Sequence, residues 1–204
     1  MDIRRSWPGR TYYAFIRRWM LPWLRRTRLT PNQMTAVGVF LAALVPVGFY
    51  FSLPAGLVFL ALSGMADTLD GFLAREQGLQ GSSFGAFWDS TLDRISDCFF
   101  LLGFWVLFWT TLPERFWPSL LMFLALLGTG LVSYTKARIE GLGGECRVGL
   151  MDRLIRTGYF ILWAALALLF RAHLESVLWS GLIVYLALVG FTVAQRVRQA
   201  SRAL

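Results

Sequence analysis

The chain has 204 residues, of which 56% are hydrophobic and only 16% are charged, and its formal net charge is +8. Soluble domains carry about 25% charged residues, so this composition excludes an ordinary soluble enzyme and indicates a protein in lipid. The long apolar runs leave little surface for a basic face, so the positive charge points to anionic lipid headgroups rather than to nucleic acid.

The first predicted element is an amphipathic helix over residues 3–28 that lies in the membrane interface. Aromatic and apolar residues recur there at three- to four-residue spacing, which places them on one helical face, and arginines occupy the rest of the surface. The alternative is an organellar transit peptide, because Asp2 is the only acid before Asp67. Transit peptides are rich in serine, whereas this segment is rich in tryptophan, so we favour the interfacial helix.

Six hydrophobic segments follow, each near the roughly 20 residues that a helix needs to cross ~30 Å of hydrocarbon. All of the 20 basic residues except Arg115 and Arg171 then fall at or near one side of the membrane. By the positive-inside rule that side is cytoplasmic, and it holds both termini of a multi-pass protein in a prokaryotic-type cell membrane. The sequence therefore predicts an all-α integral membrane protein with a single domain, residues 1–204. The predicted spans are about 31–52, 54–75, 84–111, 116–137, 154–172 and 175–195.

Acidic residues interrupt the second and third spans. Asp67 and Asp70 share one face of the second helix near its cytoplasmic end. Asp89 and Asp93 share one face of the third helix near its cytoplasmic start. The polar loop 76–84 joins the two helices, so we expect the four carboxylates to converge at one depth.

These carboxylates need a counter-charge, because each ionised aspartate inside a span costs about 2.5–3.5 kcal/mol on insertion scales. A cluster of carboxylate oxygens without histidine or cysteine is suited to Mg²⁺ or Mn²⁺. We therefore predict two divalent cations held by Asp67, Asp70, Asp89 and Asp93. Two metals held in this way typically stabilise transfer at a phosphate.

The spacing of these acids and of the small residues beside them resembles a known signature. Asp67-x-x-Asp70-Gly71-x-x-Ala74-Arg75, followed by Gly85-x-x-x-Asp89-x-x-x-Asp93, is similar to the motif of the CDP-alcohol phosphotransferases. Nine residues separate the two halves of the motif, one more than is usual in that family. The six-span layout extends the resemblance over nearly the whole chain. It implies a homodimer that transfers a phosphatidyl group from a CDP-linked lipid to an alcohol and releases CMP.

The resemblance also implies roles for single residues. In the family the four aspartates hold two metals over the CDP pyrophosphate, and the last of them, Asp93 here, is the general base for the acceptor hydroxyl. The segment 30–35 resembles the family's Thr-Pro-Asn segment at the nucleotide, and Thr30 and Pro31 equally suit a helix start. The CDP-lipid contacts implied by the resemblance are Asn32, Gln33, Met34, Thr35, Gly71, Ala74, Arg75, Ser82 and Gly85.

Basic residues beside the loop after the fourth span indicate the acceptor. Lys136 and Arg138 end that span, and Arg153 and Arg156 share one face of the next helix. Positive-inside anchoring is the alternative interpretation for each of them. Several cations converging beside a metal site favour an acceptor that itself carries a phosphate.

Three segments, 89–97, 133–141 and 149–153, look like the branch of the family that makes phosphatidylinositol phosphate or its archaeal counterpart. That likeness implies inositol phosphate as the acceptor, with glycerol 3-phosphate, the acceptor of phosphatidylglycerophosphate synthase, as the close alternative. A cation-coupled transporter could use the same acids, and it predicts translocation without nucleotide chemistry. A non-catalytic scaffold is a third class, and it has no need of five aspartates, Asp97 included, at helix depth.

Overall fold

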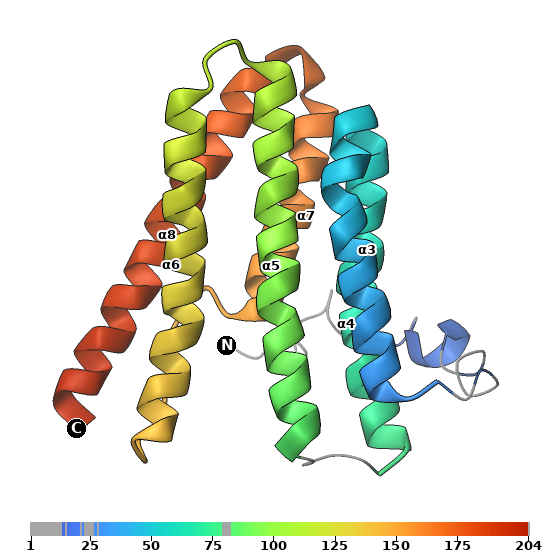
Figure 1. The fold of residues 1–204 in the computed structure, drawn as a ribbon, viewed down its shortest axis with the longest axis vertical. Coiled ribbons are helices and arrows are strands. Elements are labelled where there is room, and N and C mark those ends of the chain that lie inside the picture. The colour runs from blue at the N-terminus through green and yellow to red at the C-terminus, as the bar shows by residue number, and fades with distance from the viewer. Residues whose placement is uncertain are drawn as a thin grey trace.

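The computed structural model describes residues 14, 16–20, 22, 27, 29–78 and 83–203, which form helices and short connections (Figure 1). No strand occurs in this part of the chain, which confirms the all-α class. The long helices are α3 (Pro31–Phe51), α4 (Leu53–Glu76), α5 (Ser83–Thr111), α6 (Phe116–Gly141), α7 (Arg153–Leu169) and α8 (Leu174–Ala203). Their order and positions follow the six hydrophobic segments of the sequence.

Four segments are long and apolar enough to cross a membrane, namely α3, α4, α6 and residues 171–202, which include α8. The other two helices do not combine this length with this apolar character, because α7 has only 17 residues and α5 carries several charged residues in its first half. Large apolar side chains such as Phe40, Phe123 and Ile183 face outward, as lipid contact requires. The chain is thus an integral membrane protein, and the crossings by α5 and α7 stay a prediction.

The interfacial helix predicted over residues 3–28 lies mostly outside the described residues. Within that range the structure has a π-helical turn, η2 (Ile16–Met20), on which the Trp19 side chain is exposed. The lipid contact of this segment therefore stays a prediction.

Local sequence signals fix the α3–α4 hairpin. Thr30 and Gln33 form a capping box, in which the Thr30 amide donates to Gln33 Oε1 at 2.9 Å and the Gln33 amide donates to Thr30 Oγ1 at 3.3 Å. Ser52 is the single residue between the helices and caps α4 through the Ala55 amide. A Cβ at Gly48 would lie 2.8 Å from the Gly56 backbone, so only glycine permits this close helix contact.

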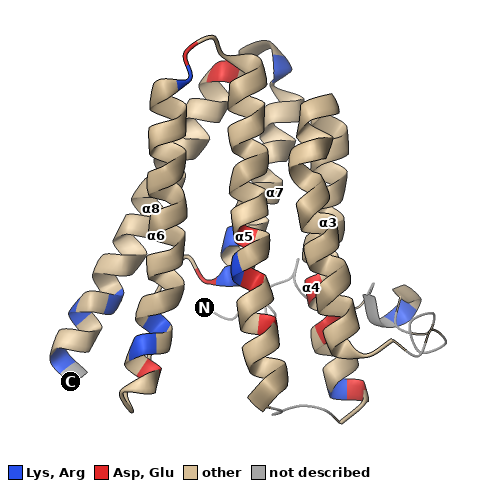
Figure 2. Cartoon of the chain, viewed as in Figure 1, with Lys and Arg blue, Asp and Glu red and all other residues tan. Residues whose placement is uncertain are grey.

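The hairpin lies at one edge of the bundle, α6 and α8 lie at the other, and α5 and α7 fill the space between them (Figure 1). Aromatic rings join the central helices: Phe104 of α5 stacks on Trp163 of α7 with ring centroids 3.9 Å apart. Charged residues gather in one half of the bundle, and only a few lie at the opposite end (Figure 2). The start of α3, the end of α8 and the acidic segments lie in that charged half.

Candidate active site

The structure brings together three of the four predicted metal ligands. One carboxylate oxygen from each of Asp67, Asp89 and Asp93 lies within 4.8 Å of the others, so α4 and α5 present their acids at one depth as the helical spacing predicts. The fourth, Asp70, faces α3, where its Oδ2 accepts a 2.9 Å hydrogen bond from Thr35 Oγ1. We refer to Asp67, Asp89 and Asp93 as the carboxylate cluster.

A guanidinium group from α7 enters the carboxylate cluster. Nη1 of Arg153 contacts Asp67 and Asp93, and it lies 3.6 Å from Oδ1 of Asp89. Arg153 is the first residue of α7, so its long side chain can extend past the helix end toward α4 and α5. Sequence reasoning assigned this arginine to the acceptor phosphate and did not anticipate its contact with the acids.

The donor atoms of the carboxylate cluster fit a hard divalent cation. All are carboxylate oxygens, and Asp93 is buried while Asp89 is partly open. Among the described residues, Oδ1 of Asp89 is a buried oxygen that accepts no hydrogen bond. A buried oxygen acceptor without a donor is costly, and a metal ion would relieve that cost.

A cavity of about 640 Å³ opens beside the carboxylate cluster, between α5, α6, α7 and α8. Asp93 lies in its wall, and Lys136 and Arg153 also line it. Arg138, the remaining predicted acceptor residue on α6, is exposed and is not part of this lining. Besides these residues, the lining includes three further arginines, Arg94, Arg156 and Arg196. We refer to Lys136, Arg153, Arg156 and Arg196 as the cationic wall.

Arg156 is fixed by a buried ion pair. Its Nη2 lies 2.6 Å from Oδ2 of Asp97, and its Nη1 donates a 2.9 Å hydrogen bond to the Met151 carbonyl. Both charged side chains are almost fully buried, at 3% and 2% exposure for Arg156 and Asp97. The pair joins α5 to α7 and gives the fifth aspartate a structural partner.

Arg196 is a member of the cationic wall that sequence reasoning missed. Its Nη2 lies 2.7 Å from Asp152 Oδ1, and its Nε donates a 3.1 Å hydrogen bond to the Val148 carbonyl. The backbone there is tight, because Gly149 has a φ of +132° and a Cβ at this position would lie 2.7 Å from Arg196. Arg196 thereby ties α8 to the loop before α7.

A sequence signal for Arg196 was present. It continues a helical stripe of buried α8 residues at three- and four-residue spacing, and an arginine on a buried stripe requires a partner. The stripe consists of Leu178, Leu182, Tyr185, Val189, Thr192 and Arg196.

The predicted CDP-lipid residues that the structure describes lie at the start of α3, at the end of α4 and at the start of α5. Met34 and Thr35 are buried, whereas Asn32 and Gln33 are exposed in the first turn of α3. A Cβ at Gly71 would meet only the mobile end of a side chain, so this face of α4 is open. On these helices Ala74 is half-buried, Arg75 is exposed and Gly85 is half-buried, and Ser82 lies outside the described residues.

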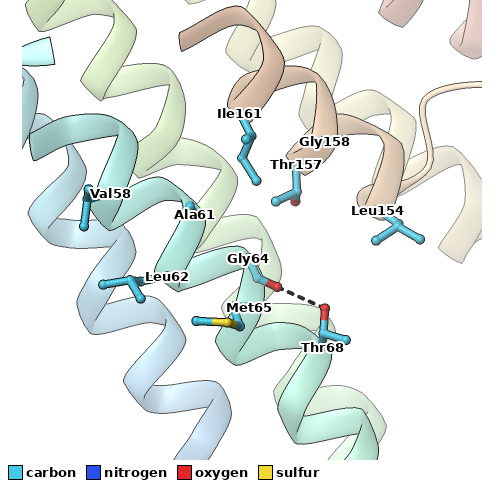
Figure 3. A pocket seen from close by; sticks show the side chains of 10 residues that line it. All are labelled: Val58, Ala61, Leu62, Gly64, Met65, Thr68, Leu154, Thr157, Gly158 and Ile161. Atoms are coloured by element: carbon cyan, nitrogen blue, oxygen red, sulfur yellow. Dashed lines mark hydrogen bonds between the residues drawn. The ribbon is translucent and has the colours of Figure 1, made fainter. Parts of the chain in front are cut away.

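An apolar groove of about 480 Å³ runs between α4 and α7 (Figure 3). It extends from Val58 to Thr68 along α4, which is about 15 Å at the helical rise. Thr68 directly follows Asp67, so the groove ends beside the carboxylate cluster. The Thr68 hydroxyl donates a 3.2 Å hydrogen bond to the Gly64 carbonyl, so both polar groups are paired within α4 (Figure 3). The remaining lining residues are Ala61, Leu62, Gly64, Met65, Leu154, Thr157, Gly158 and Ile161.

Comparisons with known proteins agree with the resemblance found in the sequence. The profile of the CDP-alcohol phosphatidyltransferase family matches residues 28–194. The chain is 35% identical over 197 residues to the archaetidylinositol phosphate synthase of Methanothermobacter thermautotrophicus, covering 96% of this chain and 94% of the relative. It is 34% identical over 149 residues to the phosphatidylinositol phosphate synthase of Mycolicibacterium smegmatis, covering 70% and 64%.

Solved structures with the same fold include the phosphatidylinositol phosphate synthase of Mycobacterium tuberculosis. The crystal structure with CDP-DAG bound has a TM-score of 0.74 and 28% sequence identity, over 90% of this chain and 92% of the other. The same enzyme in complex with manganese and citrate gives a TM-score of 0.75, over 90% and 88%.

Proposed function

Because the chain belongs to the CDP-alcohol phosphatidyltransferase family, we propose that it transfers a phosphatidyl group from CDP-diacylglycerol, or a similar CDP-lipid, to inositol phosphate and releases CMP. The observation that carries the proposal is the cavity of about 640 Å³ that has Asp93 in one part of its lining and the cationic wall in another. A phosphorylated polyol fits such a cavity, because its hydroxyl can approach the acid while its phosphate meets the cations.

The metals belong to the carboxylate cluster. Asp67, Asp89 and Asp93 would hold one or both of two divalent cations, Mg²⁺ or Mn²⁺, and Asp70 would complete the ligand set from the next turn of α4. When bound, the ions would supply positive charge to the pyrophosphate oxygens as the phosphorus is transferred. Thr35 holds Asp70 in place by its hydrogen bond, so it is a positioning residue for this ligand.

The donor would lie along α4. The open face with Gly71 and Ala74 would accept the cytidine diphosphate, together with Arg75 and the contacts predicted on α3 and α5. The apolar groove between α4 and α7 gives a lipid chain of the donor a place to lie, because it starts beside the carboxylate cluster and has apolar walls (Figure 3).

Asp93 would be the general base. It lies both in the carboxylate cluster and in the cavity lining, so it can contact the acceptor hydroxyl next to the donor phosphate. The hydroxyl oxygen forms a bond to the phosphorus that carries the diacylglycerol, and the bond from that phosphorus to the bridging pyrophosphate oxygen breaks. The hydroxyl proton passes to the Asp93 carboxylate, and the bridging oxygen leaves as part of CMP.

The acceptor is tested by comparing substrates. Membranes containing the protein, CDP-diacylglycerol and Mn²⁺ or Mg²⁺ should release CMP faster with inositol phosphate than with glycerol 3-phosphate, serine or free inositol. The cationic wall predicts that free inositol is the weakest of the polyols, because it has no phosphate to bind. Preference for glycerol 3-phosphate would reassign the acceptor within the family, and preference for free inositol would overturn the role of the cationic wall.

The lipid groove is tested at Gly158, where a Cβ would meet nothing within 4 Å. Gly158→Leu should fill the groove and raise the KM for long-chain CDP-diacylglycerol about tenfold, because burial of several methylene groups is lost. A CDP-lipid with short chains should be little affected, and Gly158→Ala is the matched control that leaves the groove open. Equal KM changes for long and short chains would contradict this location of the lipid chain.

We also propose six membrane crossings, with the active site and both termini on the cytoplasmic side, in a homodimer. The location of most charged residues in the half of the bundle that holds the carboxylate cluster supports this orientation (Figure 2). The homodimer rests on the family resemblance alone.

A further inference from the structure

Arg153 lies between two sites that make opposite demands on it. Its guanidinium contacts Asp67 and Asp93 in the carboxylate cluster. The same side chain lines the cavity, where a positive charge is needed for a phosphate. One guanidinium cannot serve both groups at full contact, so occupation of one site changes the other.

A metal ion and Arg153 compete for the same oxygens. A divalent ion such as Mg²⁺ binds carboxylate oxygens at about 2.0–2.1 Å, and the Arg153 guanidinium already contacts two of the three acids. Two cations held against the same acids repel each other strongly in a partly buried site. The guanidinium must therefore withdraw when a metal ion binds to Asp67 and Asp93.

Arg153 is the member of the cationic wall that is free to withdraw. Arg156 is held by Asp97 and the Met151 carbonyl, and Arg196 is held by Asp152 and the loop before α7. In the part of the chain that the structure describes, the ion pairs of Arg153 are all with the carboxylate cluster, and its side chain, which lines the cavity, is 25% exposed. Rotation about its side-chain bonds can carry the guanidinium from the acids to the cavity without moving α7.

We propose that Arg153 is an exchangeable counter-ion that couples metal binding to acceptor binding. Without a metal ion it neutralises the carboxylate cluster. When a metal ion replaces it there, its guanidinium joins Lys136, Arg156 and Arg196 and binds the acceptor phosphate. Because coupling is reciprocal, a phosphate in the cavity raises metal affinity by giving Arg153 another partner. The acceptor half of this statement rests on the proposed function, and the metal half does not.

The metal half is tested by Mn²⁺ binding to the purified full-length protein, measured by electron paramagnetic resonance in the absence of substrates. Arg153→Gln removes the competing cation, so its Mn²⁺ affinity should rise between about 5-fold and 150-fold, the usual range of such couplings. Arg153→Lys retains a competing charge, so its Mn²⁺ affinity should stay within about threefold of that of the wild type. Arg147→Gln is the matched control for net charge, because Arg147 is exposed and pairs with Glu145 in a loop.

Thermal unfolding gives a second readout. Without metal, Arg153→Gln leaves the three acids without their guanidinium, so the Tm of this variant should fall below that of the wild type. Saturating Mn²⁺ should raise the Tm of the variant by more than it raises the Tm of the wild type. Mn²⁺ affinity in Arg153→Gln equal to or weaker than in the wild type would overturn the proposal. Lack of Mn²⁺ binding to either protein would overturn the metal site of the proposed function, and the proposal with it.

The acceptor half is tested by repeating the titration with inositol phosphate present. The wild type should bind Mn²⁺ more tightly when inositol phosphate is present, and Arg153→Gln should lose this enhancement. Chelation of Mn²⁺ by inositol phosphate in solution is the same in both titrations, so it does not affect the comparison. Enhancement of equal size in both proteins, or in neither, would show that Arg153 does not carry the coupling. Inorganic phosphate in a parallel titration separates recognition of the phosphate from recognition of the polyol.

Discussion

Asp93→Asn is expected to lower the rate of CMP release by about 1000-fold or more, because it removes both a general base and a metal ligand. Asparagine has nearly the same shape but cannot take the proton of the acceptor hydroxyl. Asp93 is buried at the junction of the carboxylate cluster and the cavity, so no other aspartate of the cluster has its access to both.

Two measurements separate this chemical role from a structural one. CMP release gives the rate, and binding of labelled CDP-diacylglycerol should stay close to that of the wild type in Asp93→Asn. Glu145→Gln is the control for loss of an acid, because Glu145 is exposed in the loop between α6 and α7. Release of CMP by Asp93→Asn at the wild-type rate would contradict the assignment of the base.

Asp97→Ala is expected to lower the free energy of unfolding by about 3–5 kcal/mol, the usual cost of breaking a buried ion pair by removing one partner. The substitution leaves the Arg156 guanidinium buried in the bundle without its carboxylate. Chemical denaturation of the purified protein in detergent micelles measures the loss directly.

A double substitution serves as the control for this pair. Asp97→Leu with Arg156→Met replaces both charges by apolar groups, and it should recover most of the stability because no lone charge remains. The double variant should still bind the acceptor poorly, since the cationic wall has lost one of its members. Stability of Asp97→Ala within about 1 kcal/mol of the wild type would show that the pair is not a main source of stability.

The helices and the carboxylate cluster could be predicted from local patterns. Long apolar runs and the capping signal at Thr30 give the helices, and four-residue spacing brings Asp89 and Asp93 to one face of α5. The short connection after α4 then limits how far apart the acids of α4 and α5 can lie. The family resemblance drawn from the same residues is confirmed by the family match over residues 28–194.

The parts that could not be predicted depend on contacts between distant helices. Asp70 turns to Thr35 on α3, and Arg153 reaches the acids from α7, and no periodicity within one helix reports either contact. The sequence places Arg196 only among the basic residues on the cytoplasmic side, because the positive-inside rule accounts for any arginine near that end of a helix. Its place on the buried stripe of α8 becomes informative once the partner, Asp152, is known.

The most direct test of the central claim is mass spectrometry of the lipid made from CDP-diacylglycerol and inositol phosphate by the purified protein with Mn²⁺. The account predicts one phospholipid that retains the acceptor phosphate for each CMP released, and no product when the metal is chelated. No CMP, or a lipid product without the acceptor phosphate, would contradict it.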